Sequence, residues 1–538
     1  MSDATTLPEL LDGNAGGVAL VEGDAKISFA DLAQKSAKLA AGLAETGVSR
    51  GDRIAVWLPN RTDWLVSLFA AARLGAVCVA VNTRFRAAEV EDIVGRAGCS
   101  TLIYEPGFKG IDFEGILSAV DPRALSSLRR LVACGGSSAP GLRDIPTVPM
   151  TDLAATPPVS LPDARAQDGV IVFTTSGTTS RPKFVLQTQG SLAVHACEVA
   201  RAFAYDAGGT VLLQALPLCG TFGLAQALAG FAARRPSVLM PAFDAAAAAQ
   251  LIRTHSVTTF NGSDEMFARI AECAGPSDLA SVKWCGFAAF SNARVVDFVE
   301  HCAARGLRLA GLYGMSEVQA LYARQPVDAE PEKRALAGGM PVSPSARVEV
   351  RDPDTGATLP VGVSGGLYLK GPSRFLEYSG NADATSATIT PDGFVRSGDL
   401  GYLTDDGGFV FETRMGDGIR LGGFLVNPAE IDAWIERHRG VKSCQTVGVD
   451  MNGRVQPVSF VIPAGMDDVD ETDLLEHCRQ GLAGYKVPSR LFVLDRFPTT
   501  DGPNGEKIQR GALRAMAEER LWQSAGSSSA MTGSGGDP

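Results

Sequence analysis

The stretch TTSGTTSRPK, residues 174–183, directly follows the apolar run Val170–Phe173 and sets the interpretation of the whole chain. Small residues let backbone N–H groups approach an anion closely, and hydroxyl side chains add donors. Lys183 adds a cation at the rim. The pattern predicts a phosphate-binding loop after a strand, although it is not the G-x-x-x-x-G-K-[ST] loop, which the chain lacks. Read alone, the run also fits a surface loop rich in serine and threonine.

Helix and strand signals alternate on both sides of this loop. Ser28–Asp31 has capping-box spacing before a helical pattern. The apolar run Ile54–Leu58 reads as a strand, and Leu65–Val81 reads as a buried helix followed by another strand, because Arg73 and Gly75 interrupt it. This alternation predicts layered α/β structure with a sheet rich in parallel strands.

The pattern changes after the tight-turn signal Asp405–Gly408, where a smaller α+β unit begins. We therefore expect a large α/β domain at residues 1–415 and a small, mobile α+β domain at residues 416–523. The Gly/Ser-rich residues 524–538 are expected to form a disordered tail.

Composition limits the classes of protein to consider. With 538 residues the chain is long enough for at least two domains. Its formal net charge of −11 and the absence of a Lys/Arg run argue against binding to nucleic acid or to anionic membranes. The ten cysteines have no C-x-x-C spacing, and the N-terminus lacks the apolar core of a signal peptide. We expect a cytoplasmic protein, and its oligomeric state stays open.

Taken with later motifs, residues 174–183 resemble the phosphate loop of the adenylate-forming (AMP-binding) superfamily, usually T-S-G-T-T-G-x-P-K-G. The chain resembles the acyl-CoA synthetase branch from about Ile27 to about Arg514. Ser180 and Phe184 stand where glycines are usual. The further motifs, in the family's order, are Gly286–Phe290 (G-G-A-P-L-like), Tyr313–Glu317 (Y-G-x-T-E-like), Ser397–Asp399 (T-G-D-like), Gly422–Ile431 (G-G-x-x-V-x-P-x-E-I-like) and Asn504–Arg510 (G-K-I-x-R-like).

The resemblance implies a role for each matching residue. Lys507 would stabilise charge on the carboxylate and the α-phosphate, Ser316 would contact that phosphate, and Glu317 would bind Mg²⁺. Lys183 completes the implied catalytic set. The residues implied to bind the nucleotide or coenzyme A are Thr175, Ser176, Gly177, Thr178, Thr179, Phe287, Ala288, Tyr313, Asp399, Arg414, Gly422 and Gly423.

Several positions depart from the family pattern. In the segment LPLCGTFG, residues 216–223, Cys219 and Gly220 replace an aromatic residue and a histidine, which removes bulk at the mouth of the acid pocket. The segment's Phe222, together with Gly311, is assigned to the same pocket. Gly416 stands at the hinge, where Asp or Lys is usual, and could make the hinge unusually free. Gly366 replaces a common glutamate, for which we have no physical account.

The predicted activity is that of an AMP-forming acyl-CoA synthetase using ATP, Mg²⁺ and coenzyme A, with a bulky aryl, alicyclic or polycyclic acid as substrate. The departures motivate an alternative in which adenylation is weakened and a partner enzyme supplies the acyl-adenylate. A stand-alone adenylation enzyme that loads a carrier protein, a luciferase-like oxygenase and a non-catalytic nucleotide-binding protein are further alternatives.

Overall fold

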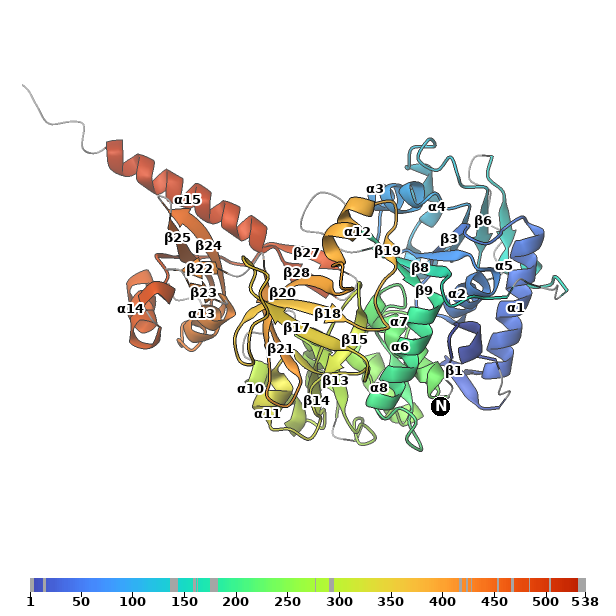
Figure 1. Ribbon diagram of the computed structural model, residues 1–538, viewed down its shortest axis with the longest axis horizontal. Helices are drawn as coiled ribbons and strands as arrows, with labels where there is room; N and C mark the ends of the chain where they lie inside the picture. Colours follow the sequence, from blue (N-terminus) through green and yellow to red (C-terminus); the bar gives the residue numbers. More distant parts are fainter. Residues whose placement is uncertain are drawn as a thin grey trace, which may run out of the picture.

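The computed structural model describes residues 4–12, 16–135, 144–157, 161, 163–174, 182–275, 277–289, 295–415, 419–421, 424–426, 428–451, 454–465, 469–482, 484–502 and 505–530. For residues 420, 424–425, 501–502, 505–507 and 522–530 it describes only the backbone. A large N-terminal α/β domain carries a smaller C-terminal unit that projects from one side (Figure 1). The predicted fold class, a large α/β domain with a smaller α+β domain, is confirmed.

Three sheets form the large domain within the described residues. The first has eight strands, in the order β19 (Glu377–Tyr378), β9 (Phe184–Thr188), β8 (Gly169–Thr174), β4 (Val77–Ala80), β3 (Arg53–Trp57), β5 (Thr101–Tyr104), β6 (Arg130–Ala133) and β7 (Thr147–Pro149). Its neighbours from β8 to β7 pair in parallel, as the alternating pattern predicts, whereas β9 pairs antiparallel with both β8 and β19.

The second sheet joins parallel and antiparallel parts. Its nine described strands are, in order, β12 (Asn261–Ser263), β13 (Cys285–Ala288), β14 (Leu309–Met315), β15 (Gln319–Arg324), β16 (Gly338–Pro341), β21 (Phe409–Arg414), β20 (Val395–Leu403), β18 (Gly365–Lys370) and β17 (Arg347–Arg351). The third is a four-stranded sheet of β10 (Leu212–Gln214), β11 (Ser237–Leu239), β1 (Val18–Glu22) and β2 (Ala25–Ser28).

Helices pack between and around these sheets (Figure 1). In the large domain they are α1 (Phe29–Glu45), α2 (Thr62–Leu74), α3 (Ala87–Val90), α4 (Phe113–Ser118), α5 (Met150–Leu153), α6 (Gln189–Ala202), α7 (Thr221–Ala232), α8 (Ala245–His255), α9 (Asp264–Cys273), α10 (Val295–Ala304), α11 (Pro331–Ala335) and α12 (Ala382–Thr388). Short 3-10 turns lie at Pro8–Leu10, Phe108–Gly110 and Gly484–Lys486, and a π-helical turn lies at Glu91–Gly95.

The local predictions for the first helices are confirmed. Ser28 and Asp31 form a reciprocal capping box, with the Asp31 N–H donating to Ser28 Oγ over 3.0 Å and the Ser28 N–H donating to Asp31 Oδ2 over 3.1 Å. The apolar run Leu65–Val81 falls on α2 and β4, which are buried on all sides rather than exposed to lipid. No helix in the described ranges is both long enough and apolar enough to cross a bilayer.

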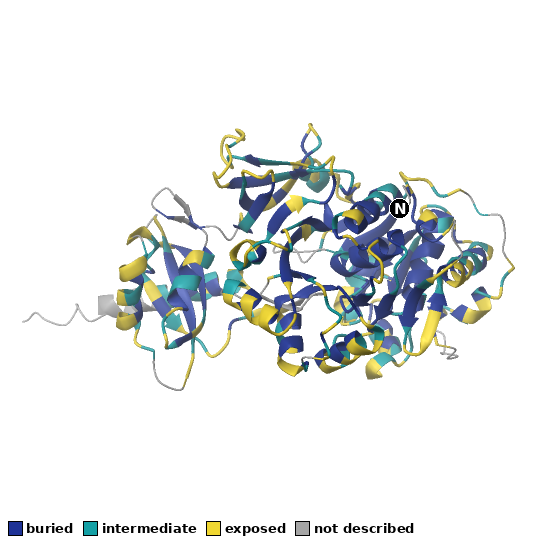
Figure 2. Ribbon diagram, turned by 90° about the horizontal axis from the view of Figure 1, so that it is seen from below, coloured by how far each residue is buried: buried dark blue, intermediate teal, exposed yellow. Residues whose placement is uncertain are grey.

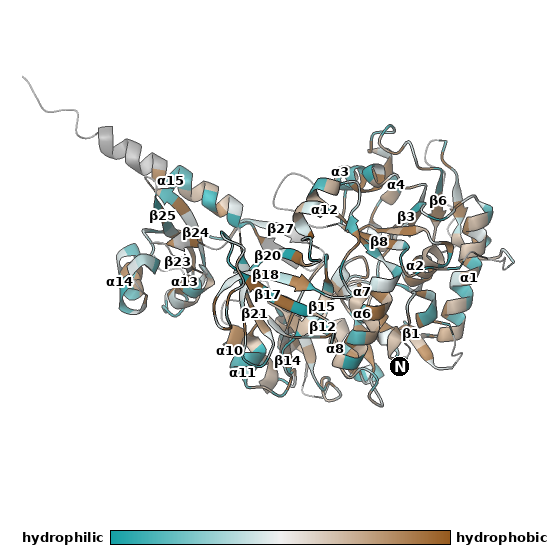
Figure 3. Ribbon diagram, in the orientation of Figure 1, coloured by the Kyte–Doolittle hydropathy of each residue, from teal (hydrophilic) through white to brown (hydrophobic). Residues whose placement is uncertain are grey.

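The C-terminal unit contains β22 (Ile419–Leu421), β23 (Phe424–Val426), β24 (Val441–Met451), β25 (Arg454–Pro463), β26 (Arg490–Val493), β27 (Thr499–Gly502), β28 (Gly505–Ile508), α13 (Pro428–Ile435), α14 (Glu471–Gly481) and α15 (Arg510–Ala530). Among the described residues, each hydrophobic cluster lies wholly on one side of positions 416–418. Each unit therefore has its own core, visible as dark-blue strands in Figure 2 and as hydrophobic central strands in Figure 3. The boundary at 415/416 stays a prediction.

The last helix overlaps the predicted tail. α15 continues to Ala530 within the described residues, and the disordered tail at residues 524–538 stays a prediction. No proline interrupts this part of the chain, and a helix propagates more readily than it nucleates. Residues 531–538 lie outside the described ones.

A buried carboxyl group in the C-terminal unit predicts a pH-dependent stability. Asp432 on α13 is 1% exposed, and its Oδ2 lies 3.7 Å from Nη2 of Arg510. Burial raises the pKa of Asp432 to about 7, and Arg510 offsets only part of this effect. The folded state then binds the proton more tightly than the unfolded state, so the free energy of unfolding falls as pH rises from about 4 to about 7 and levels off above that. The full effect of such a shift is about 4 kcal/mol.

We expect Asp432→Asn to remove this pH-dependent component. Hydrogen exchange of the β24 amides in the full chain, measured at pH 5 and pH 8, gives the stability of the unit. Asp450→Asn, at an exposed carboxylate on β24, is the matched control and should leave the pH dependence as in the wild type. A pH dependence in Asp432→Asn equal to that of the wild type would contradict the assignment.

Candidate active site

The first cluster of the site joins two of the predicted motifs. Tyr313, on β14, donates its hydroxyl to Oδ2 of Asp399 on β20 over 2.6 Å. Nε of Arg414, which pairs in register with Asp399 across β20 and β21, lies 3.2 Å from Oδ1 of the same carboxylate. Asp399 is buried, whereas the Arg414 side chain is 63% exposed. A fixed acceptor therefore lies beside a cation that can reach into solvent.

Tyr313 remains a hydrogen-bond donor in this arrangement. Burial, and then the charge of Asp399, raise the pKa of the Tyr313 hydroxyl well above its ordinary value. Its ring packs edge-to-face on Phe409, with centroids 5.1 Å apart. Tyr313 is only 7% exposed, so its ring offers little free surface.

A second cluster surrounds Glu317. Tyr378 on β19 donates its hydroxyl to Oε1 of Glu317 over 2.6 Å, and Glu317 is only 6% exposed. The Lys183 ammonium lies 4.6 Å above the centre of the Tyr378 ring. Burial, and then the charge of Glu317, raise the pKa of Tyr378, which therefore stays protonated. The carboxylate and the lysine predicted from separate motifs thus contact the same tyrosine.

The two clusters lie near each other. Tyr313 and Glu317 are the ends of the single segment 313–317. Burial and the adjacent carboxylate raise the pKa of each tyrosine. The Arg414 guanidinium, in contrast, lowers the pKa of both Tyr313 and Tyr378. One cation therefore lies close to both tyrosines.

Ser316 faces the segment that carries the predicted acid pocket. Its Oγ lies 3.2 Å from Oγ1 of Thr221, the first residue of α7, and its carbonyl oxygen accepts from Nε2 of Gln187 over 2.8 Å. Gly220 directly precedes α7 with φ −104°, a value open to every residue. The backbone therefore does not require glycine at position 220.

The chain after Glu317 is held in an unusual conformation. Gln319 and Leu321 have φ values of 65° and 64°, which non-glycine residues rarely adopt. Gln319 Nε2 donates to the Ser191 carbonyl over 2.8 Å. His195 Nε2 lies 2.8 Å from the Ala320 carbonyl, and burial lowers the pKa of His195 to about 4, so the ring is neutral near pH 7 and donates to that oxygen. These buried bonds fix residues 319–320, which directly follow the segment that carries Ser316 and Glu317.

The remaining acid-pocket and nucleotide predictions differ in how the structure places them. Cys219 is partly exposed, but burial of its thiol raises the pKa to about 12, so it is a small filler rather than a nucleophile. Phe222 is buried in the large core on α7.

A Cβ on Gly311 would lie 2.0 Å from the Leu336 carbonyl, so packing alone explains that glycine. Phe287 packs on Phe298 in the core, which leaves Ala288 nearer the surface.

Several predicted residues lie outside the described ones. They are Thr175, Ser176, Gly177, Thr178, Thr179, Gly416, Gly422 and Gly423. For Lys507 the structure describes the backbone, which pairs with Thr500 in the β27–β28 hairpin, and not the side chain. Their roles stay predictions. A Cβ on Gly366 would make only ordinary contacts, so nothing in the structure explains that glycine.

The residues present fit a magnesium-bound nucleotide. Among the described residues no group of three His, Cys, Asp or Glu side chains could hold a metal ion by itself. Mg²⁺ commonly binds one or two carboxylates plus substrate phosphates, which matches a single oriented Glu317 beside a lysine. A buried Asp399 with an adjacent exposed arginine suits a ribose diol and a phosphate.

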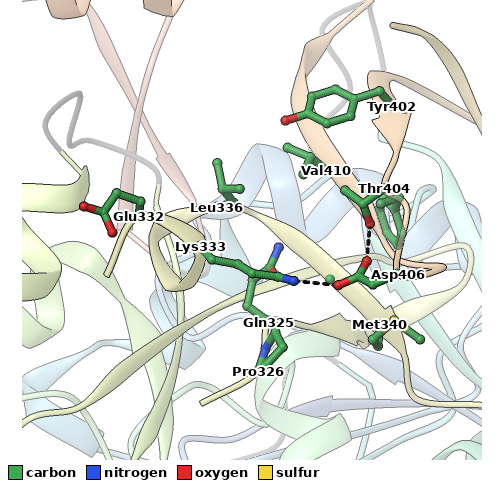
Figure 4. Close-up of a pocket in the computed structure, with 12 residues that line it drawn as sticks. Gln325, Pro326, Glu332, Lys333, Leu336, Met340, Tyr402, Thr404, Asp406 and Val410 are labelled. Carbon is green, nitrogen blue, oxygen red and sulfur yellow. Dashed lines mark hydrogen bonds and ion pairs between the residues drawn. The ribbon is translucent and has the colours of Figure 1, made fainter. Parts of the chain in front are cut away.

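A separate cavity of about 450 Å³ lies at the far end of β20 and β21. Lys333 Nζ lies 2.5 Å from Asp406 Oδ2, and Thr404 Oγ1 donates to Asp406 Oδ1 over 2.6 Å (Figure 4). These two partners lower the pKa of Asp406 to about 2. The cavity is lined by none of the predicted site residues and does not belong to the active site.

Known protein families match the chain over most of its length. The model of the AMP-binding enzyme family matches residues 11–379, and that of the AMP-binding enzyme C-terminal domain matches residues 430–502. Feruloyl-CoA synthase of Amycolatopsis sp is 30% identical over 505 residues, covering 92% of this chain and 95% of that protein. 4-Coumarate–CoA ligase 5 of Oryza sativa subsp. japonica is 27% identical over 520 residues, covering 94% and 91%.

A solved structure extends the comparison to the fold. O-succinylbenzoate coenzyme A synthetase from Bacillus subtilis, in complex with ATP and magnesium ion, superposes with a TM-score of 0.77 at 24% identity, covering 94% of this chain and 98% of that one. The two chains share one fold over nearly their whole length.

Sequence reasoning missed Tyr378 and Gln187. Tyr378 is a lone tyrosine without a local motif, and only the antiparallel pairing of β19 with β9 brings it beside Lys183 and Glu317. Gln187 follows the phosphate loop by a few positions, and no signal in the sequence connects it with Ser316.

Proposed function

The chain belongs to the AMP-binding enzyme family, and from that premise we propose that it activates a bulky carboxylic acid with Mg·ATP and transfers the acyl group to coenzyme A. It is an AMP-forming acid–thiol ligase. The observation that carries the proposal is the joining of two clusters, Tyr313–Asp399–Arg414 and Lys183–Tyr378–Glu317, through the single segment 313–317.

In the proposed first half-reaction, the carboxylate of the acid attacks the α-phosphate of ATP and pyrophosphate leaves. Asp399 and Arg414 hold the nucleotide, Ser316 faces the α-phosphate, and Lys183 binds the departing phosphates. Bound Mg²⁺ would neutralise phosphate charge next to Glu317. Catalysis then depends on positioning and on charge stabilisation by groups that are already oriented, such as the Tyr378-bonded Glu317.

In the proposed second half-reaction, the thiol of coenzyme A attacks the acyl carbon of the adenylate and AMP leaves. We propose that the C-terminal unit turns about Gly416 between the two steps, so that Lys507 moves away and the segment at Gly422 and Gly423 approaches. Domain movements of this kind commonly limit turnover.

Mass-spectrometric detection of acyl-CoA tests the proposal. Each acid of a panel is supplied with Mg²⁺ and coenzyme A, either as the free acid with ATP or as its preformed adenylate. Product by both routes is expected. Product from the adenylate alone would favour the alternative in which a partner enzyme performs adenylation, and no product by either route would contradict the proposed function. Incubation with a carrier protein in place of coenzyme A tests the alternative in which the acyl group is loaded onto a carrier protein.

We expect the size of residue 220 to determine which acids are accepted. Because φ at Gly220 suits any residue, Gly220→His can keep the local backbone conformation while adding bulk beside Thr221 and Ser316. The ratio of kcat/KM for bulky aryl acids to kcat/KM for acetate should fall by about tenfold or more. Gly230→Ala, on the same helix α7, is the control, and an unchanged ratio in Gly220→His would show that position 220 does not line the pocket.

A further inference from the structure

Lys183 has an unusual neighbour on the surface of the large domain. The Arg96 guanidinium donates from Nη2 to the Pro182 carbonyl over 2.7 Å and lies 3.8 Å from the centre of the Phe184 ring. The same arginine therefore contacts the residue before Lys183 and the residue after it. Phe184 is only 2% exposed, so its ring is a fixed platform for the cation.

Arg96 is itself fixed in place. Its Nε and Nη2 donate to the two carboxylate oxygens of Asp92 over 3.2 and 2.8 Å, the bidentate geometry that suits a planar guanidinium. It directly follows the π-helical turn Glu91–Gly95, a rare element that often occurs at functional sites. A Cβ on Gly95 would lie 2.7 Å from the Ala124 carbonyl, so close packing holds this turn against the adjacent chain.

The contacts of Arg96 extend to the proposed catalytic groups. Pro182 and Phe184 are bonded to Lys183, whose ammonium lies over Tyr378, and Tyr378 donates to Glu317. The backbone on both sides of Lys183 is thereby attached to one guanidinium. The long side chain of an exposed lysine loses much rotational freedom when it binds a ligand. A fixed backbone reduces the number of positions that the ammonium can occupy before binding.

We propose that Arg96 is a positioning residue for Lys183, acting through Pro182 and Phe184 so that the ammonium is directed toward the phosphates of Mg·ATP. The inference rests on the proposed function of Lys183. It also gives a role to Phe184, which stands where the family usually has glycine: the aromatic ring provides the surface that Arg96 holds.

The test compares Mg·ATP binding and the two half-reactions in single variants. In Arg96→Ala, the Kd for Mg·ATP measured by calorimetry is expected to rise roughly tenfold, and kcat/KM for ATP in adenylation should fall by the same factor. Conversion of a preformed acyl-adenylate to the thioester should stay within about twofold of the wild type, since the β- and γ-phosphates of ATP are absent from that step. Arg96→Lys keeps the charge but not the planar fork, and should give an intermediate Kd.

Phe184→Leu keeps most of the buried volume and removes the aromatic face, so it should weaken Mg·ATP binding about threefold. Adding Arg96→Ala to Phe184→Leu should then cost less than it costs in the wild type, because the stack is already lost. Additive losses would contradict a joint action of the two residues.

Arg234→Ala is the matched control. Its guanidinium also stacks on a phenylalanine, 4.9 Å from the Phe29 ring centre, and donates to backbone carbonyls of Leu11 and Asp12 over 3.0 and 2.8 Å. This variant should change Tm without changing the Kd for Mg·ATP. A wild type that does not bind Mg·ATP would overturn the proposed function. A wild type that binds it, together with an Arg96→Ala variant that binds it equally well or is affected only as Arg234→Ala is, would overturn the positioning role alone.

Discussion

Replacing Lys507 by alanine is expected to remove acyl-adenylate formation while leaving the conversion of a supplied acyl-adenylate to acyl-CoA. The residue lies on β28 in the β27–β28 hairpin, where its backbone pairs with Thr500. Under the proposed mechanism its ammonium stabilises charge on the carboxylate and on the α-phosphate as the mixed anhydride forms. Loss of one such group in a preorganised site typically lowers the rate by about 10²–10³-fold.

The measurement follows pyrophosphate release from the free acid and thioester formation from its preformed adenylate. Lys507→Arg should recover part of the adenylation rate because it keeps a positive charge. Lys442→Ala, at an exposed lysine on β24 of the same unit, should change neither half-reaction. Equal losses in both half-reactions of Lys507→Ala would contradict the assignment.

The sequence predicts those parts of the fold that have strong local signals. Ser28 and Asp31 fix the start of α1 through a bond pattern that can be read from their spacing. The interruption of Leu65–Val81 by a charged residue and a glycine correctly separates α2 from β4. The end of α15 carries no such signal, because Gly/Ser-rich composition does not indicate that a helix continues to Ala530.

The site is predicted only where a residue lies within a motif. Tyr313, Glu317, Asp399 and Arg414 carry such signals, and the structure joins them in two clusters. Tyr378 carries none, since its position beside Glu317 follows from the pairing of β19 with β9 across nearly two hundred residues of chain. Long-range pairing depends on the whole fold, and no local pattern encodes it.

Glu317→Gln is expected to lower the rate of adenylation on the order of 100-fold and to raise the Mg²⁺ concentration needed for half-maximal rate. Glutamine has the shape of glutamate and can still accept the Tyr378 hydroxyl, so the pocket should be retained while the negative charge is lost. Pyrophosphate exchange measured over a range of Mg²⁺ concentrations separates the loss of the metal from a general loss of rate.

Glu198→Gln is the matched control for this change. Glu198 on α6 is also a buried glutamate that accepts a hydroxyl, from Ser343 Oγ over 2.7 Å, and burial raises its pKa. Its replacement should change stability and leave the Mg²⁺ dependence unaltered. If Glu317→Gln and Glu198→Gln had the same Mg²⁺ dependence as the wild type, Glu317 would not be a metal ligand.

Tyr378→Phe tests whether the orientation of the Glu317 carboxylate matters separately from its charge. The variant removes a 2.6 Å hydrogen bond to Glu317 but keeps the aromatic ring under the Lys183 ammonium. A hydrogen bond to a charged group contributes about 1.5–3 kcal/mol, so adenylation should fall about 10–100-fold if the bond sets the position of the metal ligand. Excess Mg²⁺ should recover part of this rate in Tyr378→Phe, where the ligand is present but free to turn, and much less in Glu317→Gln, where the ligand itself has been removed.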